Sequence, residues 1–381
     1  MVPALRLVAP SGGAVEVAVP VVLAPMAGIT NAAFRQLCRE QGAGLYVAEM
    51  ITSRGIVERI PKTFDMLRFD PGETVRSVQL YGVDPDVMAK ATEILCAEFG
   101  VRHVDLNFGC PVPKVTRRGG GGVLPWKRDR LEAILRATVA AADRYGVPVT
   151  MKTRLGIDAD HETYLDAGRI AQDAGCAAIA LHARTVQQAY SGQAAWETIG
   201  ALVDRLDIPV LGNGDIWEAS DALAMVAQTG CAGVVVGRGC LGRPWLFRDL
   251  ADAFTGRRTR TLPTLGEVAA MVRRHGELLA GLHGEKHGLT DLRKHMAWYF
   301  KGFPVGGDLR RSLAMVSSFA ELDALLAQLD PSPPFPVAEL GAPRGRQGTP
   351  REKVVLPYGW LDSTELGDAD LVGAESDASG G

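Results

Sequence analysis

The stretch HVDLNFGCP, His103 to Pro111, joins a short and largely apolar run to a sharp turn. We predict a strand over His103–Asn107, ended by a turn that Gly109 and Pro111 enforce. A side chain in such a turn faces a cleft rather than a packed core. The thiol of Cys110 has an ordinary pKa of about 8.5, so it stays protonated at neutral pH and can give its proton to a developing carbanion. Cys110 is therefore a candidate general acid, and the alternative is a small buried apolar side chain.

Seven further short runs of apolar or β-branched residues occur along the chain, and each is followed by a stretch with helical periodicity. This alternation is typical of a parallel barrel. An open doubly wound sheet also alternates, but eight regular units over about 230 residues fit a closed barrel better. We predict an α/β fold with a (β/α)8 TIM barrel over residues 1–256. The other predicted strands are Val21–Met26, Leu45–Met50, Val75–Tyr81, Pro148–Thr153, Ala178–His182, Pro209–Gly212 and Gly233–Val236.

Polar and glycine-rich sequences cluster just after the predicted strands. Because barrel enzymes carry out their chemistry at the carboxyl ends of the strands, we expect these residues around one mouth of the barrel. Residues 119–122 are four consecutive glycines with basic neighbours, which predicts a mobile loop near this mouth.

Residues 257–330 have apolar positions at helical spacing and no strand-like run, which predicts a small all-helical C-terminal domain. Thr290 is placed to cap a helix that runs to Phe300, and Lys301-Gly302 marks its end. This helix would carry a basic flank, which is either a binding surface or an ordinary solvated face. The residues of this flank are Arg293, Lys294 and Lys301.

Residues 331–381 are rich in Pro, Gly, Ser and acidic residues, which predicts a mostly disordered acidic tail. The exception is Val354–Leu361, which contains Tyr358 and Trp360. This apolar segment either docks on the barrel or stays exposed, and the sequence leaves both readings open.

The composition limits the cellular compartment and the binding partners that we expect for this protein. The net charge is −3, but residues 257–330 hold eleven basic and eight acidic residues, a balance that permits a nucleic-acid partner without requiring one. The six cysteines form no C-x-x-C pair and show no zinc or iron–sulfur spacing, so we expect reduced thiols and no metal. No signal-peptide pattern and no apolar run of about 18 residues is present. We expect a soluble, cytoplasmic protein that does not bind membranes.

Two glycine-rich turns follow the last two predicted strands. Asn213-Gly214-Asp215 and Gly237-Arg238-Gly239 together resemble the phosphate grip of barrels that bind flavin mononucleotide (FMN), although either alone is more often only a turn. Lys152 is either a salt-bridge partner on the rim or a fixed cation that stabilises the anionic reduced flavin. His182 either faces the cleft or is a structural histidine.

Four further residues suit a planar heterocycle. Gln79 and Asn107 offer amide groups for the carbonyl and imide edge of the flavin ring, although both also suit strand-end caps. Arg154 and Arg184 are long donors suited to a uracil ring or a nearby phosphate.

Taken in order from about Val21 to Asp330, the motifs closely resemble those of the tRNA-dihydrouridine synthases, with the bacterial B subtype as the nearest match. The Cys-Pro and His-x-Arg-Thr motifs exclude most other flavin barrels. The motifs that carry the resemblance are Ala24–Thr30 (APMAGIT), Gln79–Gly82 (QLYG), Asn107–Pro111 (NFGCP) with Lys114, Met151–Arg154 (MKTR), His182–Thr185 (HART), Tyr190–Gly192 (YSG), Asn213–Ile216 (NGDI) and Gly237–Gly239 (GRG).

The resemblance implies an FMN-binding (β/α)8 barrel followed by a helical tRNA-binding domain, with tRNA across the groove between them. It implies that NADPH reduces FMN, that the flavin N5 hydride adds to C6 of selected uridines, and that Cys110 protonates C5 to give 5,6-dihydrouridine. FMN-binding positions fall on Pro25, Met26, Gln79, Lys152, His182, Asn213, Gly214, Asp215, Gly237 and Arg238. Positions near the uracil fall on Asn107, Arg154 and Arg184, and positions near RNA phosphates on Lys114, Arg117, Arg118, Arg293 and Lys294.

Two alternatives stay open at this point. A dihydroorotate or dihydropyrimidine dehydrogenase also pairs FMN with a uracil-like ring, but it would act on a free base and leave the basic helical domain unexplained. A noncatalytic RNA-binding module is the other alternative, against which Cys110, Lys152 and His182 together argue. The sequence determines neither the modified uridine nor the choice between NADPH and NADH, and we expect a monomer.

Overall fold

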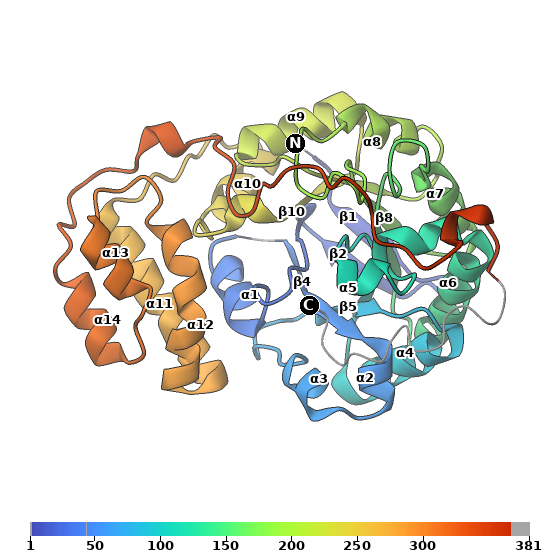
Figure 1. The fold of residues 1–381 in the computed structure, drawn as a ribbon, viewed down its shortest axis with the longest axis horizontal. Helices are drawn as coiled ribbons and strands as arrows, with labels where there is room; N and C mark the ends of the chain where they lie inside the picture. Colours follow the sequence, from blue (N-terminus) through green and yellow to red (C-terminus); the bar gives the residue numbers. More distant parts are fainter. Residues whose placement is uncertain (1, 43, 367–381) are drawn as a thin grey trace.

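The computed structural model of the protein describes residues 2–42 and 44–366. Its centre is a closed barrel of eight parallel strands in the order β10-β3-β4-β5-β6-β7-β8-β9, ringed by helices (Figure 1). The predicted (β/α)8 barrel is confirmed, and each predicted strand is present with ends that differ by a few residues at most. The barrel strands are β3 (Val21–Leu23), β4 (Leu45–Thr52), β5 (Ser77–Tyr81), β6 (His103–Phe108), β7 (Val149–Arg154), β8 (Ala178–His182), β9 (Val210–Asn213) and β10 (Gly233–Val236).

The helices of the ring begin and end where local sequence signals place them. Before α4, the Asp84 side chain accepts hydrogen bonds from the amides of Asp86 and Val87, and the helix ends at Gly100 with φ 60°. None of the helices within the described ranges is long and apolar enough to cross a membrane. The α-helices up to residue 254 are α1 (Ala32–Arg39), α2 (Ser53–Val57), α3 (Pro61–Asp65), α4 (Pro85–Phe99), α5 (Pro113–Thr116), α6 (Arg128–Asp143), α7 (Tyr164–Asp173), α8 (Trp196–Val203), α9 (Ala219–Thr229) and α10 (Leu246–Phe254).

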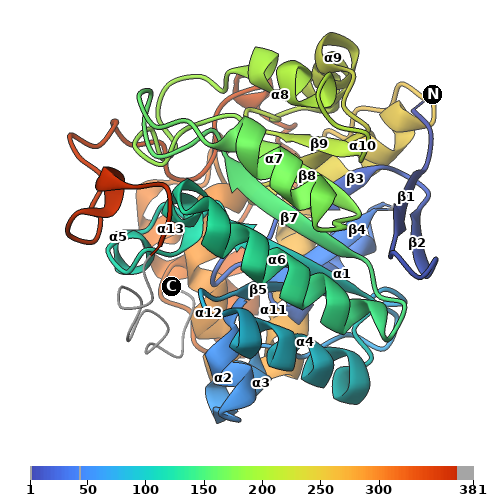
Figure 2. The same cartoon turned by 90° about the vertical axis from the view of Figure 1, so that its right-hand side faces the viewer.

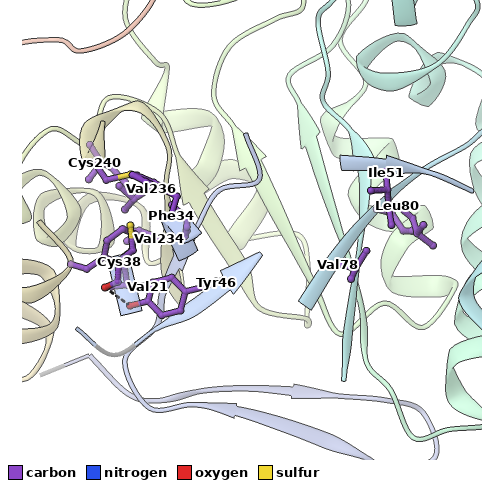
Figure 3. Packing of buried hydrophobic residues seen from close by; sticks show 14 of the residues in the cluster. Val21, Phe34, Cys38, Tyr46, Ile51, Val78, Leu80, Val234, Val236 and Cys240 are labelled. Carbon is purple, nitrogen blue, oxygen red and sulfur yellow. Dashed lines mark hydrogen bonds between the residues drawn. The ribbon is translucent and has the colours of Figure 1, made fainter. Parts of the chain in front are cut away.

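The main core lies between the strands and this ring of helices. Figure 3 shows Val21 of β3 and Val234 of β10 beside Phe34 and Cys38 of α1, all in one buried apolar cluster. The hydroxyl of Tyr46 donates a hydrogen bond to the carbonyl of Cys38 at 3.4 Å, which satisfies a polar atom within this layer. Alternate strand residues therefore face the helices, and the residues between them face the barrel interior.

An antiparallel hairpin that the sequence did not predict closes the amino-terminal end of the barrel. It consists of β1 (Leu5–Val8) and β2 (Ala14–Val17). Leu5 and Leu7 of β1 pack in one cluster with interior residues such as Val22 and Val47. Figure 2 shows the hairpin at one end of the barrel and α5 at the opposite end. The open mouth is therefore the one at which the strands end.

The predicted helical domain consists of α11 (Leu265–His283), α12 (Glu285–Tyr299), α13 (Gly307–Leu313) and α14 (Phe319–Leu326). It docks on α1, where the Phe34 ring lies 5.6 Å from His275 and 5.7 Å from His295 between centroids. The predicted cap at Thr290 is wrong, because α12 begins one and a half turns earlier and the Thr290 hydroxyl donates to the Lys286 carbonyl at 2.7 Å.

The segment after residue 331 differs from the disordered tail expected from its composition. Residues 331–366 include the short 3-10 helices η3 (Val337–Glu339) and η4 (Trp360–Asp362). Val354 and Trp360 are buried against the barrel residues Val123 and Val186, so the apolar segment docks. A few apolar side chains are enough to order a polar segment when a complementary surface exists. Residues 367–381 lie outside the described residues.

The two faces of the hairpin provide a test of its packing. Leu7 is 1% exposed, so Leu7→Ala should lower the free energy of unfolding by about 2–5 kcal/mol. The neighbouring Val8 is 36% exposed on the outer face, so Val8→Ala should change it by less than about 0.5 kcal/mol. Urea denaturation followed by circular dichroism measures both, and equal losses would contradict the role of the hairpin as a plug.

Candidate active site

One chain of hydrogen bonds crosses the barrel interior. Asp105 accepts from the Thr150 hydroxyl at 2.6 Å and from Gln79 Nε2 at 2.7 Å. The ring nitrogens of His103 contact Ser77 Oγ at 2.7 Å and Thr150 Oγ1 at 2.9 Å. Because the single hydroxyl proton of Thr150 goes to Asp105, His103 donates from Nε2 and accepts from Ser77 at Nδ1. Burial lowers the pKa of His103 to about 4, so this histidine is neutral at pH 7.

This chain of hydrogen bonds ends at the turn that holds Cys110. Asn107 Nδ2 donates to Gln79 Oε1 at 2.8 Å. Asn107 Oδ1 accepts from the amides of Gly109 at 3.1 Å and Cys110 at 2.9 Å. The side chain that precedes the turn therefore fixes both of its first amides, and Gln79 is engaged within the protein at both ends of its amide group.

Cys110 lies at the barrel mouth and is the single cysteine of the six that is not buried, all six being within the described residues. Its own partial burial raises the pKa of the thiol, while the Val112 amide and the cations of Arg154, Arg351 and Lys152 act in the opposite direction. The thiol is therefore protonated at neutral pH, with positive charge nearby to stabilise the thiolate that proton transfer would leave. The role of Cys110 as a general acid stays a prediction.

The four-glycine run is buried and packs against this turn, which differs from the mobile loop near the mouth that we predicted. Gly122 N donates to the Cys110 carbonyl at 3.0 Å. A Cβ on Gly121 would lie 2.7 Å from that carbonyl oxygen, and one on Gly120 would lie 2.6 Å from the Tyr81 hydroxyl. The glycines are needed for close approach of the backbone to its neighbours.

Asp105, which is buried, and Lys152, which is half-buried, face the same interior cavity. Burial lowers the pKa of Lys152 to about 7, with Arg154 adding to this effect and Asp105 opposing it. Burial raises the pKa of Asp105 to about 6 despite its hydrogen bonds. Pro25 also lines this cavity. Within residues 2–42 and 44–366, no cluster of three or more His, Cys, Asp or Glu side chains is arranged to hold a metal ion.

Arg154 and Arg184, predicted to approach a uracil ring, are 2% and 1% exposed and bind mainly backbone groups. Arg154 Nε donates to the Gly109 carbonyl at 2.7 Å, and its Nη1 to two further carbonyls. Arg184 pairs with both carboxylate oxygens of Asp215 at 2.7 and 2.8 Å and donates to the Ser191 carbonyl. Both arginines hold loops in place, and their contact with uracil stays a prediction.

The two glycine-rich turns meet beside a cluster of aromatic rings. The Arg238 guanidinium lies 4.7 Å from the Tyr190 ring centroid and 5.2 Å from that of Trp217. At Gly237 an added Cβ would lie 3.9 Å from the sulfur of Met26, so these two predicted residues are neighbours. On the adjacent strands, Asn213 Nδ2 donates to a β10 carbonyl. His182 is buried, and burial together with nearby cations lowers its pKa, which leaves it neutral at pH 7.

Three of the predicted RNA-contacting residues directly follow the Cys110 turn. They lie on α5 and in the turn after it, where Arg117 is exposed and the other two are half-buried. The short helix begins at Pro113, whose fixed φ suits a first helical position. The residues of this group are Lys114, Arg117 and Arg118.

The predicted basic flank of α12 is split. Lys294 approaches the barrel rim, because its Nζ would lie 4.0 Å from a Cβ added to Gly28. Arg293 turns away and donates from Nε to the Val316 carbonyl at 2.7 Å. Adjacent helical residues point about 100° apart, so the two side chains leave the helix in different directions. Their contact with RNA stays a prediction. Lys301 pairs with Glu339 at 2.7 Å.

Comparison with known proteins agrees with this geometry. A family model described as dihydrouridine synthase matches residues 22–331. The chain belongs to the dihydrouridine synthase family. This confirms the family predicted from the sequence motifs, and it argues against a dihydroorotate or dihydropyrimidine dehydrogenase.

Several relatives of this dihydrouridine synthase family member carry the same family name. A "Probable tRNA-dihydrouridine synthase" of Mycobacterium tuberculosis is 56% identical over 388 residues, which cover 100% of this chain and 97% of that protein. A "tRNA-dihydrouridine synthase B" of Serratia marcescens is 38% identical and covers 81% of this chain and 92% of that protein. The solved structure of a histamine dehydrogenase from Rhizobium sp. 4-9 has a TM-score of 0.53 at 12% identity, covering 87% of this chain and 65% of that one, and shares the fold alone.

Sequence reasoning missed Asp105 and Arg351. The alternation of polar His103, Asp105 and Asn107 with apolar residues already indicates that all three face one side of β6, and in a barrel this side is the interior. No comparable local signal marks Arg351, because its place beside the turn depends on contacts with residues far away in the sequence.

The partial exposure of Cys110 and the raised pKa of its thiol predict its reactivity. In the native protein iodoacetamide should modify Cys110 alone, and the rate should keep rising past about pH 8.5 because the pKa of this thiol is raised. Mass spectrometry of the alkylated protein across a pH series measures this, with Cys110→Ser as the unreactive control. A rate that levels off near neutral pH would contradict the protonated acid.

Proposed function

We propose that this protein is an FMN-dependent tRNA-dihydrouridine synthase that reduces the C5–C6 bond of selected uridines in tRNA, with NADPH as the source of electrons. The observation that carries the proposal is the protonated thiol of Cys110, held on a rigid turn at the barrel mouth beside Lys152. The names of the relatives supply the substrate class, since two of those compared are tRNA-dihydrouridine synthases by name.

The residues at the mouth fit FMN. The lowered pKa of Lys152 indicates that nearby negative charge does not fully stabilise its ammonium form. An electron-rich ring edge would supply this stabilisation. Arg238 and the two glycine-rich turns offer a cation and close backbone approach for a phosphate. FMN bound here would supply the hydride for C6 of uracil. The proposed FMN-binding residues are Pro25, Met26, Gln79, Lys152, His182, Asn213, Gly214, Asp215, Gly237 and Arg238.

Cys110 would complete the reduction. As C6 accepts a hydride, the Sγ–H bond of Cys110 breaks and its proton forms the new bond at C5. The sulfur is left as a thiolate, which the neighbouring cations of Arg154, Arg351 and Lys152 stabilise until water returns a proton. Asn107 contributes by holding the two amides of the turn, so that Sγ does not have to be positioned anew in each turnover.

Basic side chains on two sides of the mouth would bind the tRNA substrate. Lys114, Arg117 and Arg118 follow the Cys110 turn, and Lys294 reaches the rim from the helical domain. Flipping a uridine out of a folded tRNA costs a few kcal/mol, which phosphate contacts with these cations can offset. Arg293 would contact a different phosphate from the one near Lys294, because its guanidinium turns toward the Val316 carbonyl. Monomeric state and preference for NADPH stay predictions.

Cys110→Ala tests the acid. The variant should bind FMN and tRNA normally and reduce uridine about 10²–10⁴-fold more slowly, because general acid catalysis contributes a factor of this size. The measurement is anaerobic: NADPH-reduced protein is mixed with unmodified tRNA, and flavin reoxidation is followed by visible absorbance. The buried Cys96→Ala is the matched control.

The outcome also separates the alternatives. Unchanged single-turnover reduction by Cys110→Ala would remove Cys110 from the mechanism. Reduced flavin that is reoxidised by free pyrimidine but not by tRNA would favour a small-molecule dehydrogenase. Protein that cannot be reconstituted with FMN would contradict the proposed function.

Lys152→Gln tests the buried cation. The pKa of Lys152 is about 7 in the free protein, so the amine becomes neutral as the pH rises above 7. If bound FMN keeps the amine charged, FMN affinity should fall by up to about tenfold per pH unit above pH 7. Lys152→Gln should bind FMN more weakly below pH 7 and lose this pH dependence. Quenching of flavin fluorescence gives the Kd, and parallel pH profiles for the two proteins would contradict the role of Lys152.

A further inference from the structure

Residues 332–366 lie outside the family match and cross the barrel mouth. In Figure 1 the red segment runs from the helical domain over the strand ends to the far side of the barrel, and Figure 2 shows it at the same end as α5. The match with the Serratia marcescens protein covers 81% of this chain, whereas the match with the Mycobacterium tuberculosis protein covers 100%. The shared family core therefore does not explain what this segment does.

The first part of the segment ties the barrel to the helical domain. Phe335 is 5% exposed and packs edge-on against Trp245. Arg344 is 3% exposed, and its Nη1 donates to the Leu241 carbonyl at 3.3 Å and to the Trp298 carbonyl at 2.9 Å. Leu241 belongs to the barrel and Trp298 to α12, so one guanidinium bridges the two parts.

The middle part of the segment crosses the mouth from Arg238, in the glycine-rich turn after β10, to the turn that holds Cys110. Arg238 Nη1 donates to the Arg346 carbonyl at 2.6 Å. The Arg351 amide donates to the Gln187 carbonyl at 3.0 Å. The Arg351 side chain then reaches the catalytic turn, where Nη1 donates to the carbonyl of Pro111, the residue after Cys110.

The last part anchors the segment on the barrel. Trp360 is 3% exposed, and its Nε1 donates to the Val123 carbonyl at 3.2 Å. The Lys127 ammonium lies 5.0 Å from the Trp360 ring centroid and donates to the carbonyls of Ser363 at 2.7 Å and Glu365 at 3.1 Å. Val123 directly follows the glycine run beneath Cys110. Arg351 is therefore held between two fixed ends.

We propose that residues 335–366 are a working part of the active site and that Arg351 is a positioning residue for Cys110. Three successive carbonyls of the catalytic turn have protein donors: Arg154 binds that of Gly109, Gly122 that of Cys110, and Arg351 that of Pro111. Two of these donors come from the barrel, and the third comes from the segment outside the family match. This inference rests on the proposed role of Cys110 as the acid.

Arg351 acts on Cys110 in two ways. Its hydrogen bond to the Pro111 carbonyl restrains the turn, so that Sγ stays at one position. Its charge favours the thiolate that forms when the Sγ–H proton passes to C5. Removal of Arg351 should therefore affect both the acidity of the thiol and the proton-transfer step.

The test uses the full-length holoenzyme. The pH midpoint for alkylation of Cys110 by iodoacetamide is measured for the unaltered protein, Arg351→Ala and Arg351→Lys. The alanine variant should raise the midpoint by roughly half a pH unit or more, because an opposite charge is lost. The lysine variant should recover part of the shift. Single-turnover reduction of tRNA should slow several-fold in Arg351→Ala, with the Kd for FMN unchanged.

Two further variants serve as a control and a second test. Lys353→Ala removes the same charge from an exposed position two residues away and should leave the midpoint unchanged. Trp360→Ala releases the anchor of the segment and should reproduce the effect of Arg351→Ala.

The possible results are distinguishable. An unchanged midpoint and an unchanged single-turnover rate in Arg351→Ala would overturn the inference. A loss of tRNA affinity without any shift in the midpoint would also overturn it, because the segment would then bind RNA and not position the thiol. Alkylation needs no tRNA, so a holoenzyme that never reacts with tRNA would contradict the proposed function while the midpoint still decides the role of Arg351.

Discussion

The pair of hydrogen bonds from the amides of Gly109 and Cys110 to Asn107 Oδ1 determines where the reactive thiol lies. Asn107 is itself held by Gln79, and Gln79 by the carboxylate of Asp105. A buried carboxylate is costly unless its oxygens are satisfied, so the members of this chain cannot reorient independently. The position of Cys110 is therefore set by the polar interior of the barrel and not by the loop alone.

Closure of the barrel floor makes this polar interior chemically active. The hairpin places Leu5 and Leu7 against the lower, apolar half of the interior. Burial is the largest cause of the shifted pKa values of Asp105 and Lys152, and it also raises the pKa of Cys110. The low dielectric of such an interior strengthens the interaction of a fixed cation with a nearby charge.

Arginine side chains around the mouth have a structural role, although arginine near an active site is usually expected to bind substrate. Arg154 and Arg184 hold loop carbonyls inside the protein, and Arg344 and Arg351 do the same from the C-terminal segment. A planar guanidinium with five donors can bridge several carbonyls at once, which suits it to fastening irregular loops. The turn that holds Cys110 is consequently restrained by donors from the barrel and from the segment that crosses the mouth.

The eight strands, the helical domain, the family and the location of Cys110 at a strand end could all be predicted from the amino-acid sequence. These features depend on local periodicity, turn residues and short motifs, and the alternation around Asp105 shows that the inward face of β6 was also within reach. Four features became visible only in the folded chain. The glycine run is packed, Arg293 and Lys294 diverge, two predicted uracil-binding arginines bind carbonyls, and residues 331–366 dock across the mouth. Each of these depends on neighbours brought together by the closure of the barrel, such as Arg351 and Pro111, which are 240 residues apart. No local pattern encodes such a pair, because its stability comes from a surface that exists only once the chain has folded.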